Sequence, residues 1–216
     1  MKINQTIPVK RTKKLFDNNY RYKAVIICLF SGFFRGNNIQ FAQQTLKEAK
    51  KTGKYPLWTK KATTKDVDFA LEICKVLSKM KDYSLRIESP IISFYSNELS
   101  DIKNLTDISL EAVKYVSMPE ENQSMAKDTV YVRNLDYDFR VTMGRTIQTH
   151  TNFINWINAN PKKIRMPKRC LEDLERGHSW GGGYFYVKDN KTLTMVKMFL
   201  GNSIARVDSV VKLPKN

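Results

Sequence analysis

The chain has 216 residues, of which 42% are hydrophobic, 27% are charged and 11% are aromatic. This balance supplies enough apolar surface for one domain of mixed structure or two small ones, and it excludes a disordered tail, a collagen-like repeat and a long coiled coil. No apolar run approaches the ~18 residues that a membrane-spanning helix needs, so we expect no membrane span.

Charge is segregated along the chain. The formal net charge is +16, from 37 basic and 21 acidic residues. Residues 1–62 carry a net +12 and residues 139–216 a net +9, whereas residues 63–138 carry −5. Concentrated positive charge attracts polyanions and releases their counterions, so the two basic ends predict a polyanionic partner. Nucleic acid is the first expectation, and acidic protein subunits or an anionic membrane surface are the alternatives.

The cysteines indicate the redox setting. Cys28, Cys74 and Cys170 form no CxxC pair, and two histidines are too few for a zinc site of finger-like spacing. We therefore expect free thiols, no metal and no cofactor. Free thiols favour a cytoplasmic or otherwise intracellular location. Abundant Lys, Asn and Ile indicate an AT-rich genome, and the compact make-up of the chain would suit a virus or phage, so a virion is a further expected setting.

The first half of the chain alternates helical and extended patterns. Ile39, Ala42, Leu46 and Ala49 fall on one face of a helix, which indicates an amphipathic segment. In chain order, we expect a basic arm (1–22), a buried strand (24–33), a helix capped by Asn38 and ended by Gly53, a helix (64–80), two strands (84–88 and 91–96), a helix (99–106), a strand (113–118) and an acidic loop (119–127).

The second half has the clearest pattern. Asp136-Tyr137-Asp138 is a turn-like triplet between two apolar segments, so a hairpin over 129–143 is expected. The elements predicted there are strands 129–135 and 139–143, a helix to residue 159 that begins at Thr151 or Asn152, a strand (164–166), a helix (170–176), a glycine loop (181–183), a strand (183–187), a helix (191–200) and a strand (204–213).

These elements predict an α+β fold with a mixed or antiparallel sheet. From Phe139 to Leu213 their order fits a ferredoxin-like split βαβ unit, or a variant with an insertion at 167–182. The helices would cover one sheet face, and the other face would be open or covered by the N-terminal half. The predicted organisation is an arm (1–22), an N-terminal α+β part (23–127) and a C-terminal ferredoxin-like part (128–216), and one continuous domain is the alternative.

Two segments resemble the strand motifs of the RNA-recognition motif family. Val130–Leu135 matches the first-strand motif of an aliphatic, an aromatic, an aliphatic, any residue, Asn and Leu. Gly183–Val187 is similar to the third-strand motif, which is rich in glycine and aromatic residues. The resemblance implies that Tyr131, Tyr184 and Tyr186 stack on bases.

The chain departs from this family's pattern in several places. Gly182 replaces a basic residue, Phe185 a small residue and Asp189 an aromatic one, and the predicted strand 139–143 stands where the first helix of the family would begin. We therefore do not assign the chain to this family, and we expect a hairpin within a different α+β fold.

Two stretches combine basic and aromatic or apolar residues in a way that suits nucleic acid. Around Tyr55 and Trp58, lysines could hold phosphates while the rings stack on bases, although Trp58 could equally anchor the core. Residues 162–169 hold five basic residues, and alternation places Lys163 and Arg165 on one strand face; a solvated edge strand is the alternative. The predicted contact residues are Lys10, Arg11, Lys13, Lys14, Lys50, Lys51, Lys54, Tyr55, Trp58, Lys60, Lys61, Lys162, Lys163, Arg165, Lys168 and Arg169.

Candidate catalytic groups are few. His150 and His178 could act as general bases, but no nucleophile elbow, P-loop or HExxH motif accompanies them. Carboxylates at Asp136 and Asp138 suit a turn, and the other acidic pairs suit helix termini or surface ion pairs. We assign no catalytic or metal-binding residue.

The sequence therefore predicts a non-enzymatic protein that binds nucleic acid through its basic N-terminal segment and the 162–169 stripe. A structural component of a virion or ribonucleoprotein assembly is the alternative. A metal-dependent nuclease that uses Asp136 is a minor one.

Overall fold

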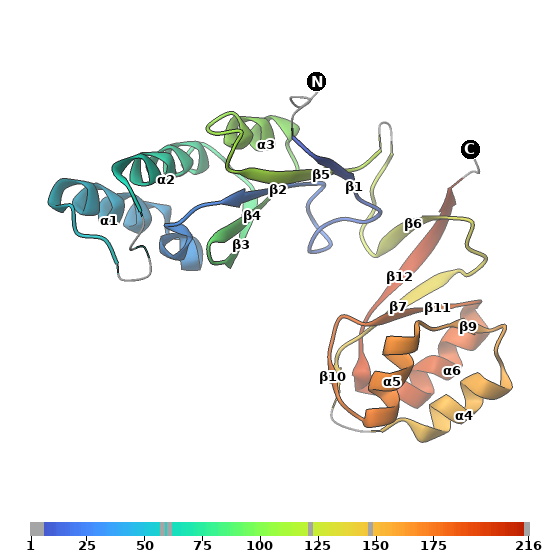
Figure 1. Ribbon diagram of the computed structural model, residues 1–216. Coiled ribbons are helices and arrows are strands. Elements are labelled where there is room, and N and C mark those ends of the chain that lie inside the picture. Colours follow the sequence, from blue (N-terminus) through green and yellow to red (C-terminus); the bar gives the residue numbers. More distant parts are fainter. Residues whose placement is uncertain (1–6, 57–58, 60–61, 121–122, 147–148, 214–216) are drawn as a thin grey trace. The chain divides into compact units, whose positions relative to one another are not determined.

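The computed structural model describes residues 7–56, 59, 62–120, 123–146 and 149–213, and the chain divides into two compact units, 1–125 and 126–216 (Figure 1). The boundary expected from the sequence, after residue 127, lies two residues from the observed one. Each unit combines helices with one five-stranded sheet, which confirms the α+β class. None of the helices in the described part of the chain has the length and apolarity needed to cross a membrane.

The first unit has a mixed sheet in the order β1-β5-β2-β4-β3. Only the β1–β5 pair is parallel, and the other pairs are antiparallel. In chain order its elements are β1 (Val9–Arg11), β2 (Tyr22–Ile27), η1 (Ser31–Asn37), α1 (Ile39–Thr52), α2 (Thr64–Leu77), β3 (Tyr83–Glu88), β4 (Ile91–Ser96), α3 (Leu99–Thr106) and β5 (Val113–Met118).

The core of the first unit lies between one sheet face and its helices. Alternate residues of the central strands, among them Ala24, Phe94 and Val116, are fully buried. They pack in one cluster with Ile102 and Leu105 of α3 and with apolar residues of α1 and α2. Because side chains alternate along a strand, the residues between them point to the opposite face of the sheet.

The N-terminal segment takes part in this unit rather than forming only an arm. Residues 9–11 form β1 and pair with residues 116–118 of β5. Ile7 and Leu15 on either side of β1 are buried. This difference from the expected aperiodic arm arises from a pairing more than 100 residues away, which local sequence patterns do not show.

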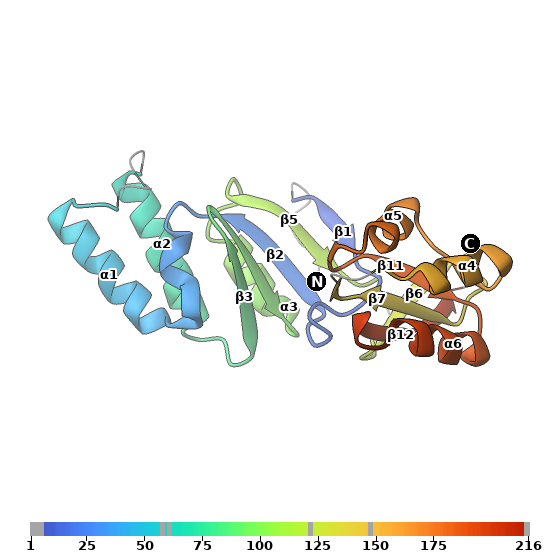
Figure 2. The same ribbon diagram turned by 90° about the horizontal axis from the view of Figure 1, so that it is seen from below.

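The second unit has a sheet in the order β6-β12-β7-β11-β9 (Figures 1 and 2). In chain order its elements are β6 (Thr129–Arg133), β7 (Phe139–Met143), β8 (Arg145–Thr146), α4 (Thr151–Ala159), β9 (Ile164–Arg165), α5 (Lys168–Arg176), β10 (Ser179–Trp180), β11 (Tyr184–Val187), α6 (Asn190–Leu200), η3 (Gly201–Ser203) and β12 (Ile204–Leu213). β8 and β10 form a separate two-stranded ladder.

The predicted hairpin over 129–143 is wrong. β12 lies between β6 and β7, pairing parallel with β6 and antiparallel with β7. The turn-like triplet at residues 136–138 connects the two strands without pairing them, because a strand of ten residues from the end of the chain offers both a partner. Turn chemistry is local, whereas this choice of partner is not.

The four strands β12, β7, β11 and β9 are neighbours in that order, and each neighbouring pair is antiparallel. Along the chain they alternate with α4 and α6, and α5 is inserted between β9 and β11. β6 extends this sheet beyond β12. The α+β class is confirmed, and the ferredoxin-like assignment stays a prediction.

Candidate nucleic-acid interface

All three α-helices of the second unit lie on the same face of its sheet. Phe153 of α4, Leu174 of α5 and Val196 of α6 share one buried cluster with Val141 of β7 and Phe185 of β11. Figure 1 shows these helices together below the strands. No helix of the described second unit therefore lies on the other face, which we call the helix-free face.

The helix-free face is lined by arginines and tyrosines. Alternation along β7, β11, β9 and β12 places on it the residues that flank the buried positions. These residues are Arg140, Thr142, Arg165, Tyr184, Tyr186, Arg206 and Asp208. Strand register aligns four of them in one row, because Tyr186 pairs with Arg165 on one side and with Arg140 on the other, and Arg140 pairs with Asp208.

The two tyrosines form the aromatic part of this face. Tyr184 is 41% exposed, and its ring lies edge-on to Tyr186 with the centroids 5.8 Å apart. The guanidinium carbon of Arg140 lies 4.8 Å from the centroid of the Tyr184 ring, a cation–π contact. Burial raises the pKa of the Tyr186 hydroxyl above its ordinary value.

A buried carboxylate pairs with two arginines of this face, Arg140 and Arg206. Asp208 is 1% exposed and lies 3.2 Å from Nη2 of Arg140 and 2.8 Å from Nε of Arg206. An ionised carboxylate at such a site requires opposite charge close by. Asp208 therefore pairs with the arginine that contacts the Tyr184 ring, and the face keeps more positive than negative charge.

The basic stripe at residues 162–169 borders this face. Lys162 and Lys163 are exposed in the turn before β9, and Arg165 is exposed within β9. Lys168 and Arg169 are exposed in the first turn of α5, where Lys168 lies 3.9 Å from Glu172. The strand itself covers only Ile164 and Arg165, so the expected alternation around Lys163 is replaced by a turn.

The first unit has its own group of basic and aromatic side chains. Lys23 of β2 points away from the core, and its ammonium lies between 5.5 and 5.9 Å from the ring centroids of Phe16, Tyr95 and Tyr115. The ammonium of Lys10 lies 3.8 Å from the centroid of the same Tyr115 ring. Of the predicted contact residues, Lys10 thus belongs to an aromatic group that the sequence does not reveal.

The neighbouring basic residues of the N-terminal segment are placed less uniformly. Arg11 is exposed and donates through Nη1 to the carbonyl oxygen of Pro119 at 2.8 Å. Lys13 is exposed, whereas Lys14 is half-buried.

The predicted cluster around Tyr55 divides into separate parts. Lys50 pairs with Asp68 at 2.6 Å, and Lys51 and Lys54 are exposed. Tyr55 is half-buried, with its ring edge-on to Phe30 of the core at 5.8 Å, so it packs inside the unit. The predicted contacts Trp58, Lys60 and Lys61 lie outside the described residues.

The candidate catalytic groups have structural partners. His150 is buried with Nε2 3.1 Å from Oγ of Ser203, and burial lowers its pKa. Asp136 pairs with Lys188, and Lys212 lies 3.2 Å from both Asp136 and Asp138. In the described residues, no group of three or more His, Cys, Asp or Glu side chains could hold a metal ion.

Several residues of the interface were missed from the sequence. Arg140 and Thr142 flank Val141 in a strand of alternating character, and this pattern could have placed them opposite the core. Arg206, Lys23 and Tyr115 carry a similar but weaker signal. Tyr131, implied as a stacking residue by its resemblance to a family motif, is 9% exposed on β6, and β12 and β7 separate that strand from β11.

Positive charge is shared equally by the two units. Residues 1–125 hold 21 basic and 13 acidic residues, and residues 126–216 hold 16 basic and 8 acidic residues, so each unit carries a formal net charge of +8.

Comparison with protein-family models, with curated proteins and with solved structures finds no match for the chain.

Proposed function

We propose that the chain binds single-stranded nucleic acid on the helix-free face of the second unit. Tyr184 and Tyr186 stack on bases, and Arg165, with the rest of the 162–169 stripe, neutralises phosphates. The observation that carries the proposal is the register pairing of Arg165 with Tyr186, because it joins the basic stripe to the aromatic part of the sheet.

The face suits single strands better than duplexes. Stacking on a tyrosine needs an unpaired base with an accessible face, and bases inside a duplex do not offer one. The centroids of the Tyr184 and Tyr186 rings lie 5.8 Å apart on one strand, and Arg140, which pairs with Asp208, contacts the Tyr184 ring. A support that is held in place loses little conformational freedom when a base stacks on it.

The N-terminal segment supplies a second, electrostatic contribution in this proposal. Lys10, Arg11 and Lys13 are exposed, and together with Lys51 and Lys54 they extend the positive surface of the first unit. Contacts of this kind add affinity without sequence preference, because they are made to phosphates.

Fluorescence-anisotropy titrations of the whole chain test the proposal. Single- and double-stranded DNA and RNA oligonucleotides are titrated at several salt concentrations. We expect single strands to bind more tightly and the affinity to fall steeply with salt, by roughly 0.7 in the log–log slope for each phosphate that is neutralised.

A matched pair of variants locates the binding. K163A/R165A should weaken binding and reduce the salt slope by about 1.4. K191A/K197A removes exposed lysines from α6 in the helical layer and should change both quantities less. Absence of binding at low salt, or an equal effect of the two variants, would overturn the proposal.

A further inference from the structure

A cavity adjoins the helix-free face beside Tyr184. Its volume is about 470 Å³, within the range of small-ligand sites, and it is lined by Pro167, Arg169, Cys170, Asp173, the glycines at 181–183 and Tyr184. Gly181 and Gly182 have φ angles of +84° and +82°, a backbone conformation that suits glycine and shapes this wall. Tyr184 belongs to both the helix-free face and the cavity. A nucleic-acid strand bound on that face would therefore bring one of its nucleotides to the cavity.

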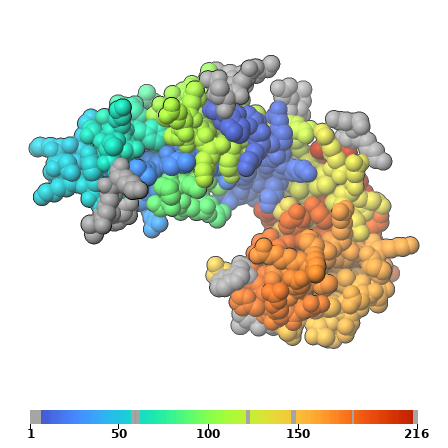
Figure 3. All heavy atoms as spheres, in the orientation of Figure 1, coloured from blue at the N-terminus to red at the C-terminus, as the bar shows by residue number. Residues whose placement is uncertain are grey.

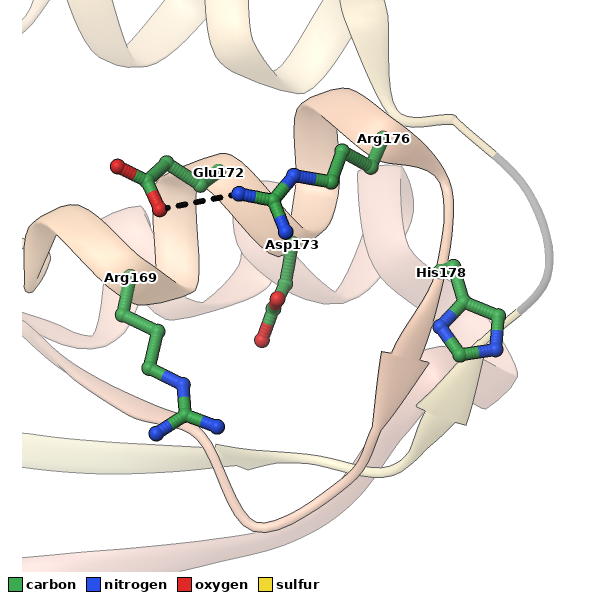
Figure 4. Close-up of a pocket in the computed structure, with 5 residues that line it drawn as sticks. All are labelled: Arg169, Glu172, Asp173, Arg176 and His178. Carbon is green, nitrogen blue, oxygen red and sulfur yellow. Dashed lines mark hydrogen bonds and ion pairs between the residues drawn. The ribbon is translucent and has the colours of Figure 1, made fainter.

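Two charged side chains of opposite sign, Arg169 and Asp173, line this cavity. Arg169 and Asp173 are four residues apart on α5 and lie on the same side of the helix (Figure 4). Neither side chain forms a hydrogen bond or an ion pair with another described residue, whereas Glu172 beside them pairs with Arg176 at 3.3 Å. Both also line a neighbouring cavity of about 410 Å³.

An unpaired carboxylate is unexpected where a polyanion binds. It repels phosphates, and a ligand that displaces water from this half-buried carboxylate has to bring hydrogen-bond donors in exchange. α5 lies at the surface of the second unit (Figure 3, orange), and Asp173 on this helix is half-buried and lines the cavity. Glu175 on the same helix is exposed and lines neither cavity, so Asp173 is distinguished by its position.

The four bases differ in what they offer to a carboxylate. Guanine presents two adjacent donors, N1–H and the N2 amino group, that match the two oxygens of a carboxylate. Adenine and cytosine present one amino group next to an acceptor nitrogen, and uracil and thymine present one N–H between two carbonyl oxygens. Guanine is also the base whose N7 and O6 acceptors pair with an arginine fork.

We propose that this cavity binds a guanine base of the strand held on the helix-free face. Asp173 accepts hydrogen bonds from N1–H and the N2 amino group, Arg169 donates to the opposite edge of the base or to its phosphate, and the adjacent base stacks on Tyr184. This inference rests on the proposed function and adds a base preference to it.

Binding of matched single-stranded octamers to the whole chain tests the inference. The probes are fluorescein-labelled oligo(U), and the same oligonucleotide with one central guanine, adenine, cytosine or inosine, at one salt concentration. We expect the guanine octamer to bind roughly tenfold more tightly than the adenine, cytosine and all-uracil octamers. Inosine, which lacks the N2 amino group, should bind with intermediate affinity.

Two isosteric variants separate recognition from charge. D173N should abolish the guanine preference, whereas E175Q, with the same change of charge on the same helix, should retain it. Equal binding of all octamers by the wild-type chain, or equal loss in both variants, would overturn the inference and leave the proposed function standing. Failure of every octamer to bind would overturn the proposed function itself.

Discussion

Asp208 is buried between two guanidinium groups, one of which is itself almost completely enclosed. The side chains of Asp208 and Arg140 are 2% and 9% exposed, and their charged atoms lie 3.2 Å apart. Removal of one partner from such a site leaves a buried charge without compensation. The row of residues that supports Tyr184 therefore depends on this carboxylate for its stability as well as for its geometry.

We expect D208N to lower the free energy of unfolding by about 3–5 kcal/mol in urea denaturation, because Arg140 loses its counter-charge in a buried site. D138N, which removes an exposed carboxylate paired with Lys212, should change it little. Equal small effects of both variants would show that Asp208 does not compensate Arg140.

His150 makes stability depend on pH in a definite direction. Burial lowers its folded-state pKa below the ordinary 6.5, so the folded chain resists a proton that the unfolded chain accepts. The contribution of the neutral imidazole is complete above pH 6.5 and is lost as the pH falls through the folded-state value. Urea denaturation between about pH 7 and pH 5 should show a loss of stability that is smaller in H150N; identical pH profiles would contradict this assignment.

At the scale of elements, the sequence predicts most boundaries that local chemistry sets. α1 runs from Ile39 to Thr52, with the Asn38 side chain accepting from the amide of Phe41 and Gly53 in the left-handed conformation, as the capping pattern indicates. The predicted bounds of α3 and β12 also match the observed ones. Capping residues and apolar periodicity act within a few residues, so the sequence displays them directly.

The pairing of the strands could not be predicted in the same way. The insertion of β12 between β6 and β7, and the pairing of β1 with β5, join segments far apart in the chain. For the same reason the sequence shows the stripe at 162–169 and the tyrosines of β11, but not that Arg165 and Tyr186 face each other. The sequence shows which residue types each strand carries, but the candidate site is formed only when the pairing register of β9 with β11 is known.

The Asn38 cap of α1 should contribute to the free energy of unfolding. N38A should lower the free energy of unfolding by about 1 kcal/mol, because the amide of Phe41 loses its 3.0 Å acceptor. N38S supplies another capping oxygen and should remain close to wild type, as followed by urea denaturation. A cost of N38S equal to that of N38A would contradict the capping role.

The two units have the same net positive charge, but they differ in how their aromatic side chains are exposed. Each carries +8, so each attracts polyanions. In the first unit the Lys23 ammonium lies beside three aromatic rings of the same unit, those of Phe16, Tyr95 and Tyr115. In the second unit Tyr184 remains 41% exposed beside Arg140, with a cavity next to it. We therefore expect base contacts mainly in the second unit.

Photo-crosslinking shows directly whether bases contact β11 of the second unit. The whole chain is irradiated with a single-stranded oligonucleotide that carries 4-thiouridine, and the modified peptides are identified by mass spectrometry. We expect adducts on β11, at Tyr184 and Tyr186, that disappear when excess unlabelled single strand is added. Adducts confined to α4 and α6, in the helical layer of the same unit, would contradict it.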